Sequence, residues 1–278
     1  YIPTTILNGY NGLKPRIISI HDIQHNHYPE NFSYFELRSR RIAYDLSIKY
    51  SHSIQASSEF IKKDLIKNYK FLKKKFIPVI REGIDLKKFK IEKKDKIDNL
   101  PKKYLFYPAQ LWPHKDHITV LKAFNKIKDN CNIHLIFTGS KMSSYNEIKN
   151  FIEINNLNNR VNILGLVKLK KLKLLYKNAL AIVIAAKYES SSLPILEASC
   201  IGAPIIASNT EPNIELKKYL KILTFKVSNF NDLGKKILKI NNKKTFRKRM
   251  VFHNKEKIKK FEWINVVNQY IKYFDSIK

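Results

Sequence analysis

The residues whose side chains are best suited to catalysis or ligand binding lie together in one short segment. Two carboxylates, Glu189 and Glu197, enclose the run Ser190–Ser192 and are separated by seven residues. The apolar stretch Ala179–Ala186 ends just before Glu189, so this carboxylate is expected at the carboxyl end of a buried strand. Pro194 marks an early position of the helix that follows, and the amides at the start of that helix would face outward as an anion site.

Glu197 falls in the first turns of the same predicted helix. A carboxylate there can accept two hydrogen bonds from a vicinal diol, such as that of a ribose. The alternative is that Glu197 is only an acid favoured by the positive end of the helix dipole. The spacing alone leaves both interpretations open.

Short apolar runs alternate with longer helical patterns along the chain. The predicted strands are Arg16–Ile20, Ser53–Ala56, Lys75–Ile80, Tyr104–Pro108, Ile133–Thr138, Val161–Leu164, Ala181–Ala185 and Pro204–Ala207. The predicted helices are Tyr34–Tyr50, Ser58–Tyr69, His117–Lys128, Tyr145–Asn155, Leu169–Asn178, Pro194–Cys200 and Asp232–Ile240. Several strands are continuously apolar, as in a parallel sheet buried on both faces, so the pattern predicts an α/β fold.

A charged stretch, Leu86–Lys103, separates two α/β regions and is the expected domain boundary. We expect a partial N-terminal domain over 1–88, a second Rossmann-like domain over 89–260 and a C-terminal amphipathic helix over 261–278. The sequence starts at Tyr1 without a Met and with few strands before the boundary, so we expect a fragment that lacks the N-terminal part of its first domain.

The segment Tyr188–Ser208 resembles the Glu-x7-Glu donor-site motif of retaining GT-B glycosyltransferases, family 4 or group 1. The residues at matching places are Glu189, Leu193, Pro194, Leu196, Glu197, Ala198, Gly202 and Pro204. Ser190–Ser192 replace the usual triplet of a small residue, an aromatic residue and glycine. Serine still offers backbone amides, but glycine is the residue that lets a phosphate approach most closely.

Further segments resemble the family in the same order along the chain. They are Ile18–Asp22, His21–Ser33 (as in a subgroup with mannosyl- and rhamnosyl-type transferases), Ala56–Asp64, Val79–Phe89, Tyr107–Asp116, Phe137–Ser140, Val161–Gly165 and Leu174–Ala179. Three of them depart from the family pattern: Gln110 stands where the family has an arginine, the second glycine after Gly139 is lost, and Glu82 stands where the family usually has an asparagine. A neutral amide at position 110 removes one positive charge from the diphosphate site.

The resemblance implies two Rossmann-like domains that face each other across a cleft. It implies transfer of a hexose, with a mannosyl type plausible, from a nucleotide diphosphate sugar to a glycan or lipid-linked acceptor, with retention and without a metal or cofactor. It implies catalytic roles for His21, Glu189 and Lys115. The donor-binding residues that it implies are Glu197, Gln110, Ser190, Ser191, Ser192, Leu193 and Gly139. A catalytically inactive, nucleotide-sugar-binding relative is the alternative, which Gln110 and the lost glycine favour.

The net charge of +30 has two interpretations. Selection for a polyanionic partner is one of them, and the codon usage of an A/T-rich genome, which enriches Lys, Ile and Asn, is the other. The 45 Lys against 8 Arg argue against specific base contacts, and no nucleic-acid motif accompanies the charge. We therefore expect no nucleic-acid partner, and a cytoplasmic protein that contacts an anionic membrane surface peripherally through part of the excess charge.

The remaining titratable residues give weaker signals. Two cysteines, Cys131 and Cys200, are too few for a disulfide scaffold and fit a reducing compartment. His21, His25 and His27 have the right side chains for a metal, but their spacing in a loop is a poor template for a site, so no metal is expected. His114 and His117 flank Lys115 and are interpreted equally well as solvent-exposed loop residues or as site residues.

Overall fold

A computed structural model describes residues 16–92, 97 and 100–277, which form two compact units. The first unit comprises Tyr1–Gly83, Glu189–Ser191 and Trp263–Lys278, and the second comprises Ile84–Tyr188 and Ser192–Glu262. The chain passes from one to the other at Gly83, earlier than the expected boundary after residue 88. The reason is that Ile84 already pairs with the end of the second unit, where its amide donates to the Phe261 carbonyl at 2.8 Å.

The second unit is built on a six-stranded, fully parallel sheet. Its spatial order is β5 (Val161–Ile163), β4 (His134–Thr138), β3 (Tyr104–Pro108), β6 (Ala181–Ile184), β7 (Ile205–Ser208) and β8 (Leu223–Phe225). This is the doubly wound order, in which the direction of strand addition reverses between β3 and β6. The continuous burial of β3, β6 and β7 agrees with the apolar runs of the sequence.

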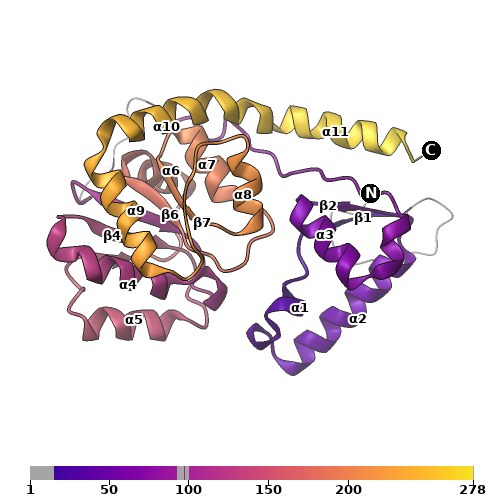
Figure 1. The fold of residues 1–278 in the computed structure, drawn as a ribbon, viewed down its shortest axis with the longest axis horizontal. Coiled ribbons are helices and arrows are strands. Elements are labelled where there is room, and N and C mark those ends of the chain that lie inside the picture. Colours follow the sequence, from indigo (N-terminus) through magenta and orange to yellow (C-terminus); the bar gives the residue numbers. More distant parts are fainter. Residues whose placement is uncertain (1–15, 93–96, 98–99, 278) are drawn as a thin grey trace. The chain divides into compact units, whose positions relative to one another are not determined.

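Helices cover both faces of this sheet because right-handed crossovers on either side of the reversal lie on opposite faces. Figure 1 shows the two sets. One face carries α4 (His117–Ile127), α5 (Tyr145–Ile154) and α9 (Phe230–Asn242), and the other carries α6 (Leu169–Asn178), α7 (Leu193–Ile201) and α8 (Glu211–Lys217). The helix α10 (Lys244–Lys257) packs against α7 and α9.

The first unit holds a small parallel sheet of β1 (Ile17–Ile20) and β2 (Ser53–Ala56). The helices around it are α1 (Gln24–His27), α2 (Tyr34–Tyr50) and α3 (Glu59–Asn68). Ser33 and Glu36 form a reciprocal capping box that fixes the start of α2. The side chain of each residue accepts a hydrogen bond from the backbone amide of the other, and neither amide has a partner within the helix.

One predicted strand, Lys75–Ile80, is wrong. This segment forms only an isolated bridge between Val79 and Ala56, after a 3-10 turn at Lys70–Lys74. Pro78 has no N–H to donate, so the segment cannot extend a regular ladder beside β2. The structure also adds elements that the sequence reading did not predict, namely α1, α8, α10 and β8.

The C-terminal helix α11 (Trp263–Asp275) belongs to the first unit. Its Val266 and Tyr273 are buried in one cluster with Ile17 and Ile80. The Tyr273 hydroxyl also lies 2.5 Å from the Ser53 hydroxyl, so this amphipathic helix is held to the small sheet by apolar and polar contacts together. Both sheets are parallel and both units are α/β, so the predicted fold class is confirmed.

Candidate functional site

The strand-order reversal between β3 and β6 defines where the second unit can bind a ligand. Open α/β sheets bind ligands beyond the carboxyl ends of their strands at such a point. Gln110 and Lys115 follow β3, Gly139 follows β4, and Ser192 and Leu193 follow β6. The structure therefore brings these five predicted residues to one edge of one sheet. Of the other predicted residues, Glu189, Ser190, Ser191 and His21 belong to the first unit.

Gly139 allows the loops after β3 and β4 to pack against each other. Its φ is +130°, and a Cβ at this position would lie 2.4 Å from the carbonyl oxygen of Ala109. On either side of it, the Ala109 amide donates to Thr138 O at 3.0 Å and the Leu111 amide donates to Ser140 O at 3.1 Å. Only glycine combines this backbone conformation with so close an approach, so Gly139 shapes the site through its backbone.

The loop that carries Lys115 is fixed from two sides. The Tyr107 hydroxyl donates to the Lys115 carbonyl at 2.6 Å. The Lys187 amide, from the connection after β6, donates to the His114 carbonyl at 2.7 Å. The two connections that flank the reversal are thus hydrogen-bonded to each other, which fixes the backbone of Lys115 beyond the carboxyl end of β3.

Asp116 holds the end of this loop in a left-handed conformation, with φ of 52°. Its buried carboxylate accepts hydrogen bonds from the Thr119 amide at 3.3 Å, the Thr119 hydroxyl at 2.8 Å and the Ser228 hydroxyl at 2.8 Å. Asp116 therefore caps α4 and ties the Lys115 loop to the turn before α9. Ser228 is 112 positions away, so no local sequence pattern predicts it as the partner of Asp116.

Replacement of Asp116 by glycine is expected to destabilise the second unit by about 2 kcal/mol, because the cap and its hydrogen bonds are lost while glycine still accepts the positive φ. Ser228→Ala removes one of those bonds and is expected to cost about 1 kcal/mol. Asn156→Gly is a matched control, since Asn156 also has a positive φ (53°) but is exposed. Urea unfolding measures the free energy of unfolding of all three variants. An unchanged free energy in Asp116→Gly would show that the Asp116 carboxylate does not cap α4.

His114 and His117 are not exposed loop residues. His117 is buried and stacks on the Tyr107 ring, with 4.5 Å between centroids. Burial, followed by the charge of Lys115, lowers the pKa of each histidine to about 3. Both are therefore neutral at pH 7, and Lys115 is the one positive side chain in the segment Pro113–His117.

Gln110 is exposed at the start of the same loop. The Trp112 indole N–H donates to its Oε1 atom at 2.8 Å. This hydrogen bond orients the amide and leaves the NH₂ group of Gln110 as its donor toward solvent. Trp112, which the sequence pattern did not single out, therefore orients a predicted site residue.

The start of α7 carries an unsatisfied polar group. Ser192 is the N-cap residue and is 1% exposed, yet its hydroxyl has no hydrogen-bond partner within the described residues. A buried hydroxyl is nearly always paired, so the Ser192 hydroxyl is a candidate donor to a ligand. Leu193 follows at the first helical position and is 42% exposed.

Glu197 lies beyond the first turn of α7, so the helix dipole does not explain its position. The Tyr176 hydroxyl, from α6, donates to its Oε2 atom at 2.6 Å. Burial raises the pKa of Glu197, while the hydrogen bond from Tyr176 acts in the opposite direction. Tyr176 is fully buried, so it holds the carboxylate in a fixed orientation.

His21 follows β1 in the first unit. Its Nδ1 atom lies 3.7 Å from Oε1 of Glu82, the residue that replaces the family's usual asparagine. The His21 carbonyl accepts a hydrogen bond from the Ser57 hydroxyl at 3.1 Å. Glu189 is 9% exposed. His21 and Glu189 lie in the same unit.

The neighbouring histidines have separate surroundings. His25 is buried against the Tyr44 ring, and burial lowers its pKa to about 4. His27 instead contacts Asp64, with 2.6 Å between Nε2 and Oδ2. Within the described ranges, no three His, Cys, Asp or Glu side chains gather as a metal site would require.

The sequence matches the model of a known protein family. The model of the family "Glycosyl transferases group 1" matches residues 88–257, which is more than half of the chain. The chain belongs to this family. The matched region contains the edge of the sheet described above.

Over the part of the chain that the structure describes, no helix is long and apolar enough to cross a membrane.

The group 1 chain is also similar to individual proteins. It is 27% identical over 200 residues to the O-antigen chain mannosyltransferase RfbU of Salmonella typhimurium, an alignment that covers 71% of this chain and 53% of RfbU. The chain thus spans about half the length of this curated relative.

Two solved structures have the same fold. Anabaena Alr3699/HepE, in complex with UDP and glucose, superposes with a TM-score of 0.78 at 19% identity, over 95% of this chain and 72% of that one. Sucrose-phosphate synthase from Thermosynechococcus elongatus gives 0.79 at 19% identity, over 94% and 67%. These neighbours confirm the predicted GT-B glycosyltransferase fold.

Proposed function

We propose that this protein transfers a hexose from a nucleotide diphosphate sugar to a glycan or lipid-linked acceptor, with retention at the anomeric carbon. The observation that carries the proposal is the gathering of Gln110, Lys115, Gly139, Ser192 and Leu193 at the strand-order reversal of a group 1 domain. The name of RfbU supports a mannosyl-type donor and a role in surface polysaccharide synthesis. Such a role places the protein in the cytoplasm, at the inner face of a membrane.

The reaction requires stabilisation of negative charge on the departing nucleoside diphosphate. Lys115 supplies a positive charge. It is the one positive side chain of its loop, because the histidines on either side are neutral at pH 7. The amides and hydroxyl at the start of α7 supply further donors, and the hydroxyl of Ser192 has no other partner within the described residues. These groups are fixed before the reaction, so they stabilise the transition state without reorganisation and without a metal ion.

The donor is held by groups on both sides of the diphosphate. Glu197, oriented by Tyr176, accepts hydrogen bonds from the ribose hydroxyls. The NH₂ group of Gln110 donates to a phosphate oxygen, which gives a weaker interaction than the arginine usual in the family. Glu189 and His21 hydrogen-bond the hydroxyls of the transferred sugar, and Glu189 stabilises the positive charge that develops at its anomeric carbon.

The test is release of the nucleoside diphosphate from a panel of donors: GDP-mannose, UDP-glucose, UDP-N-acetylglucosamine and ADP-glucose. We expect turnover with one nucleotide, strong loss in Glu189→Gln, and an anomeric configuration in the product that matches the donor. Tight nucleotide binding without turnover of any donor would instead favour an inactive relative, as Gln110 in place of arginine suggests.

A further inference from the structure

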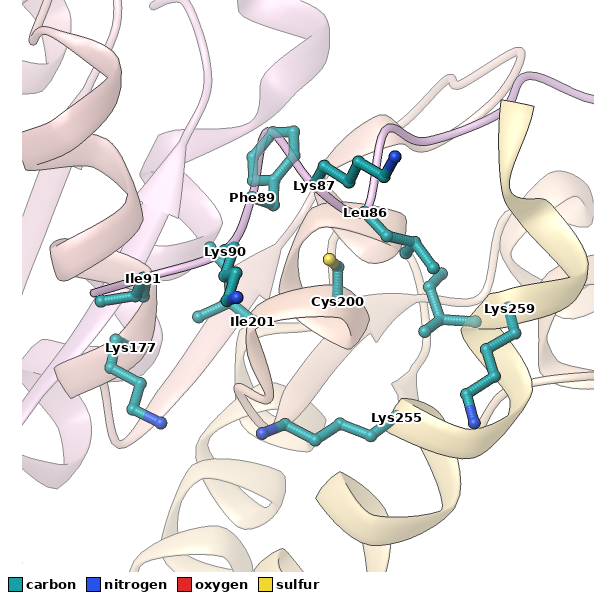
Figure 2. Close-up of a pocket in the computed structure, with 11 residues that line it drawn as sticks. Leu86, Lys87, Phe89, Lys90, Ile91, Lys177, Cys200, Ile201, Lys255 and Lys259 are labelled. Carbon is teal, nitrogen blue, oxygen red and sulfur yellow. The ribbon is translucent and has the colours of Figure 1, made fainter. Parts of the chain in front are cut away.

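The second unit contains a cavity of about 430 Å³ that the proposed donor site does not use. It lies between the segment 86–91, the C-terminal ends of α6 and α7, and the end of α10 (Figure 2). The residues that line it are Leu86, Lys87, Phe89, Lys90, Ile91, Lys177, Cys200, Ile201, Lys255, Ile258 and Lys259. None of the predicted donor-site residues is among them; Ser192 and Leu193 stand at the start of α7, whereas this cavity lies at its end.

The charged residues that line this cavity are all lysines, while Asp85, Glu197 and Glu262 lie close enough to act on the lining residue Cys200. Five lysines line it, and no Asp or Glu does so among the described lining residues. Figure 2 shows the ammonium groups of Lys177 and Lys255 on the same side of Cys200 and Ile201, whereas that of Lys87 points away. Lys90, Lys177 and Lys255 make no ion pair with any described residue.

The floor of the cavity is apolar. Phe89, Ile201 and Ile258 are 9% exposed or less. Burial raises the pKa of Cys200 to about 11, so its thiol is also uncharged at pH 7. A cavity with an apolar floor and a cationic rim matches a ligand that is itself amphiphilic, with an anionic group beside an apolar one.

The wall formed by 86–91 is held in place. The Lys173 ammonium of α6 donates to the carbonyls of Lys88 at 3.2 Å and Lys90 at 2.7 Å. The Asp85 carboxylate accepts from the Lys88 amide at 2.9 Å. These bonds fix the position of the lysine-bearing segment before any ligand arrives, which lowers the entropic cost of binding.

The adjoining helix carries features of a membrane-surface contact. Phe252 of α10 is 74% exposed and lies three positions before Lys255, on the same side of the helix. The helix has six Lys or Arg residues against the single acid Glu256. An exposed aromatic ring beside basic side chains gives an anionic bilayer one apolar contact next to the electrostatic attraction.

We propose that this cavity binds the phosphate headgroup of an anionic membrane lipid, with the lysines on the phosphate and the apolar floor against the adjoining glycerol and acyl carbons. The site shares no lining residue with the predicted donor site and would hold the protein on the bilayer surface. Its ligand is part of a membrane rather than a free phosphate compound, because Phe252 gives the same face an apolar contact outside the cavity.

The experiment is co-sedimentation of the full chain with phosphatidylcholine vesicles, with and without phosphatidylglycerol. We expect binding only to the anionic vesicles. The triple variant Lys90→Ala, Lys177→Ala, Lys255→Ala should bind roughly 100-fold more weakly, from about fivefold for each lysine near an anionic surface. The corresponding triple lysine-to-arginine variant keeps the charges and should retain binding, which separates loss of charge from loss of folding.

The matched control removes three exposed lysines elsewhere on the same unit, Lys122, Lys226 and Lys235. It loses the same formal charge and should bind within about threefold of the wild type if the cavity is the site. An equal loss in both triple alanine variants would mean diffuse attraction and would overturn the proposal. Displacement by soluble glycerol phosphate, at concentrations equal to the lipid phosphate, would identify a free phosphate compound as the ligand and would overturn the lipid assignment.

Discussion

Replacement of Gly139 by alanine is expected to destabilise the second unit by about 4 kcal/mol, from backbone strain and steric overlap together. The φ of +130° is unfavourable for any residue with a Cβ, and the new methyl group would lie 2.4 Å from the Ala109 carbonyl oxygen. To relieve this overlap, the loops after β3 and β4 must separate, which also displaces Gln110 from the edge of the sheet.

Unfolding in urea can be followed through Trp112, which lies in the same loop region, in a Trp263→Phe background that removes the tryptophan of the first unit. Gly165→Ala is the matched control, since Gly165 also has a positive φ (66°) but open space where its Cβ would lie. It should cost about 1 kcal/mol. Equal losses in the two variants would show that the close approach of the two loops is not what requires Gly139.

Removal of the Lys115 charge is expected to lower kcat by about 10²- to 10³-fold, the usual effect of deleting one preorganised group that stabilises transition-state charge. The KM for the donor should change much less, because the charge on the leaving diphosphate grows as the glycosidic bond breaks. The measurement is the steady-state rate of nucleoside diphosphate release by Lys115→Ala with the donor found in the panel.

Lys122→Ala provides the comparison for this variant, since Lys122 is an exposed lysine on α4, the helix that follows the same loop. It should retain wild-type kinetics. A Lys115→Ala enzyme with unchanged kcat and a raised KM would show that Lys115 only binds the ground state. That result would require another group to neutralise the leaving diphosphate.

The parallel sheet of the second unit was predictable because its strands are continuous apolar runs. β3 and α6 were predicted with the bounds they have, and β6 within a residue. β8 was missed because Leu223–Phe225 is only three residues long and partly exposed. α10 was missed because only Met250 and Asn254 are buried in it, so its basic sequence shows little helical apolar periodicity.

The site was predictable where sequence neighbours lie together and not where the fold joins distant residues. The segment around Glu189 and Glu197 could be assigned by resemblance and by its place after a strand. The hydrogen bond from Tyr176 to Glu197 spans 21 positions, and the bond from Ser228 to Asp116 spans 112. No local pattern encodes such contacts, because they depend on how the helices pack on the sheet.

The edge of the sheet at the β3–β6 reversal is expected to bind a nucleoside diphosphate through Glu197. Isothermal titration of the full chain with UDP, GDP and ADP measures this binding, beside Glu197→Ala and the exposed control Glu153→Ala on α5. We predict that one nucleotide binds, that Glu197→Ala weakens its binding about 10- to 100-fold, as expected for hydrogen bonds to a charged group, and that Glu153→Ala leaves it unchanged. Binding of no nucleotide by the folded chain, or equal affinity in the wild type and Glu197→Ala, would show that Glu197 does not hold a nucleoside diphosphate at this edge.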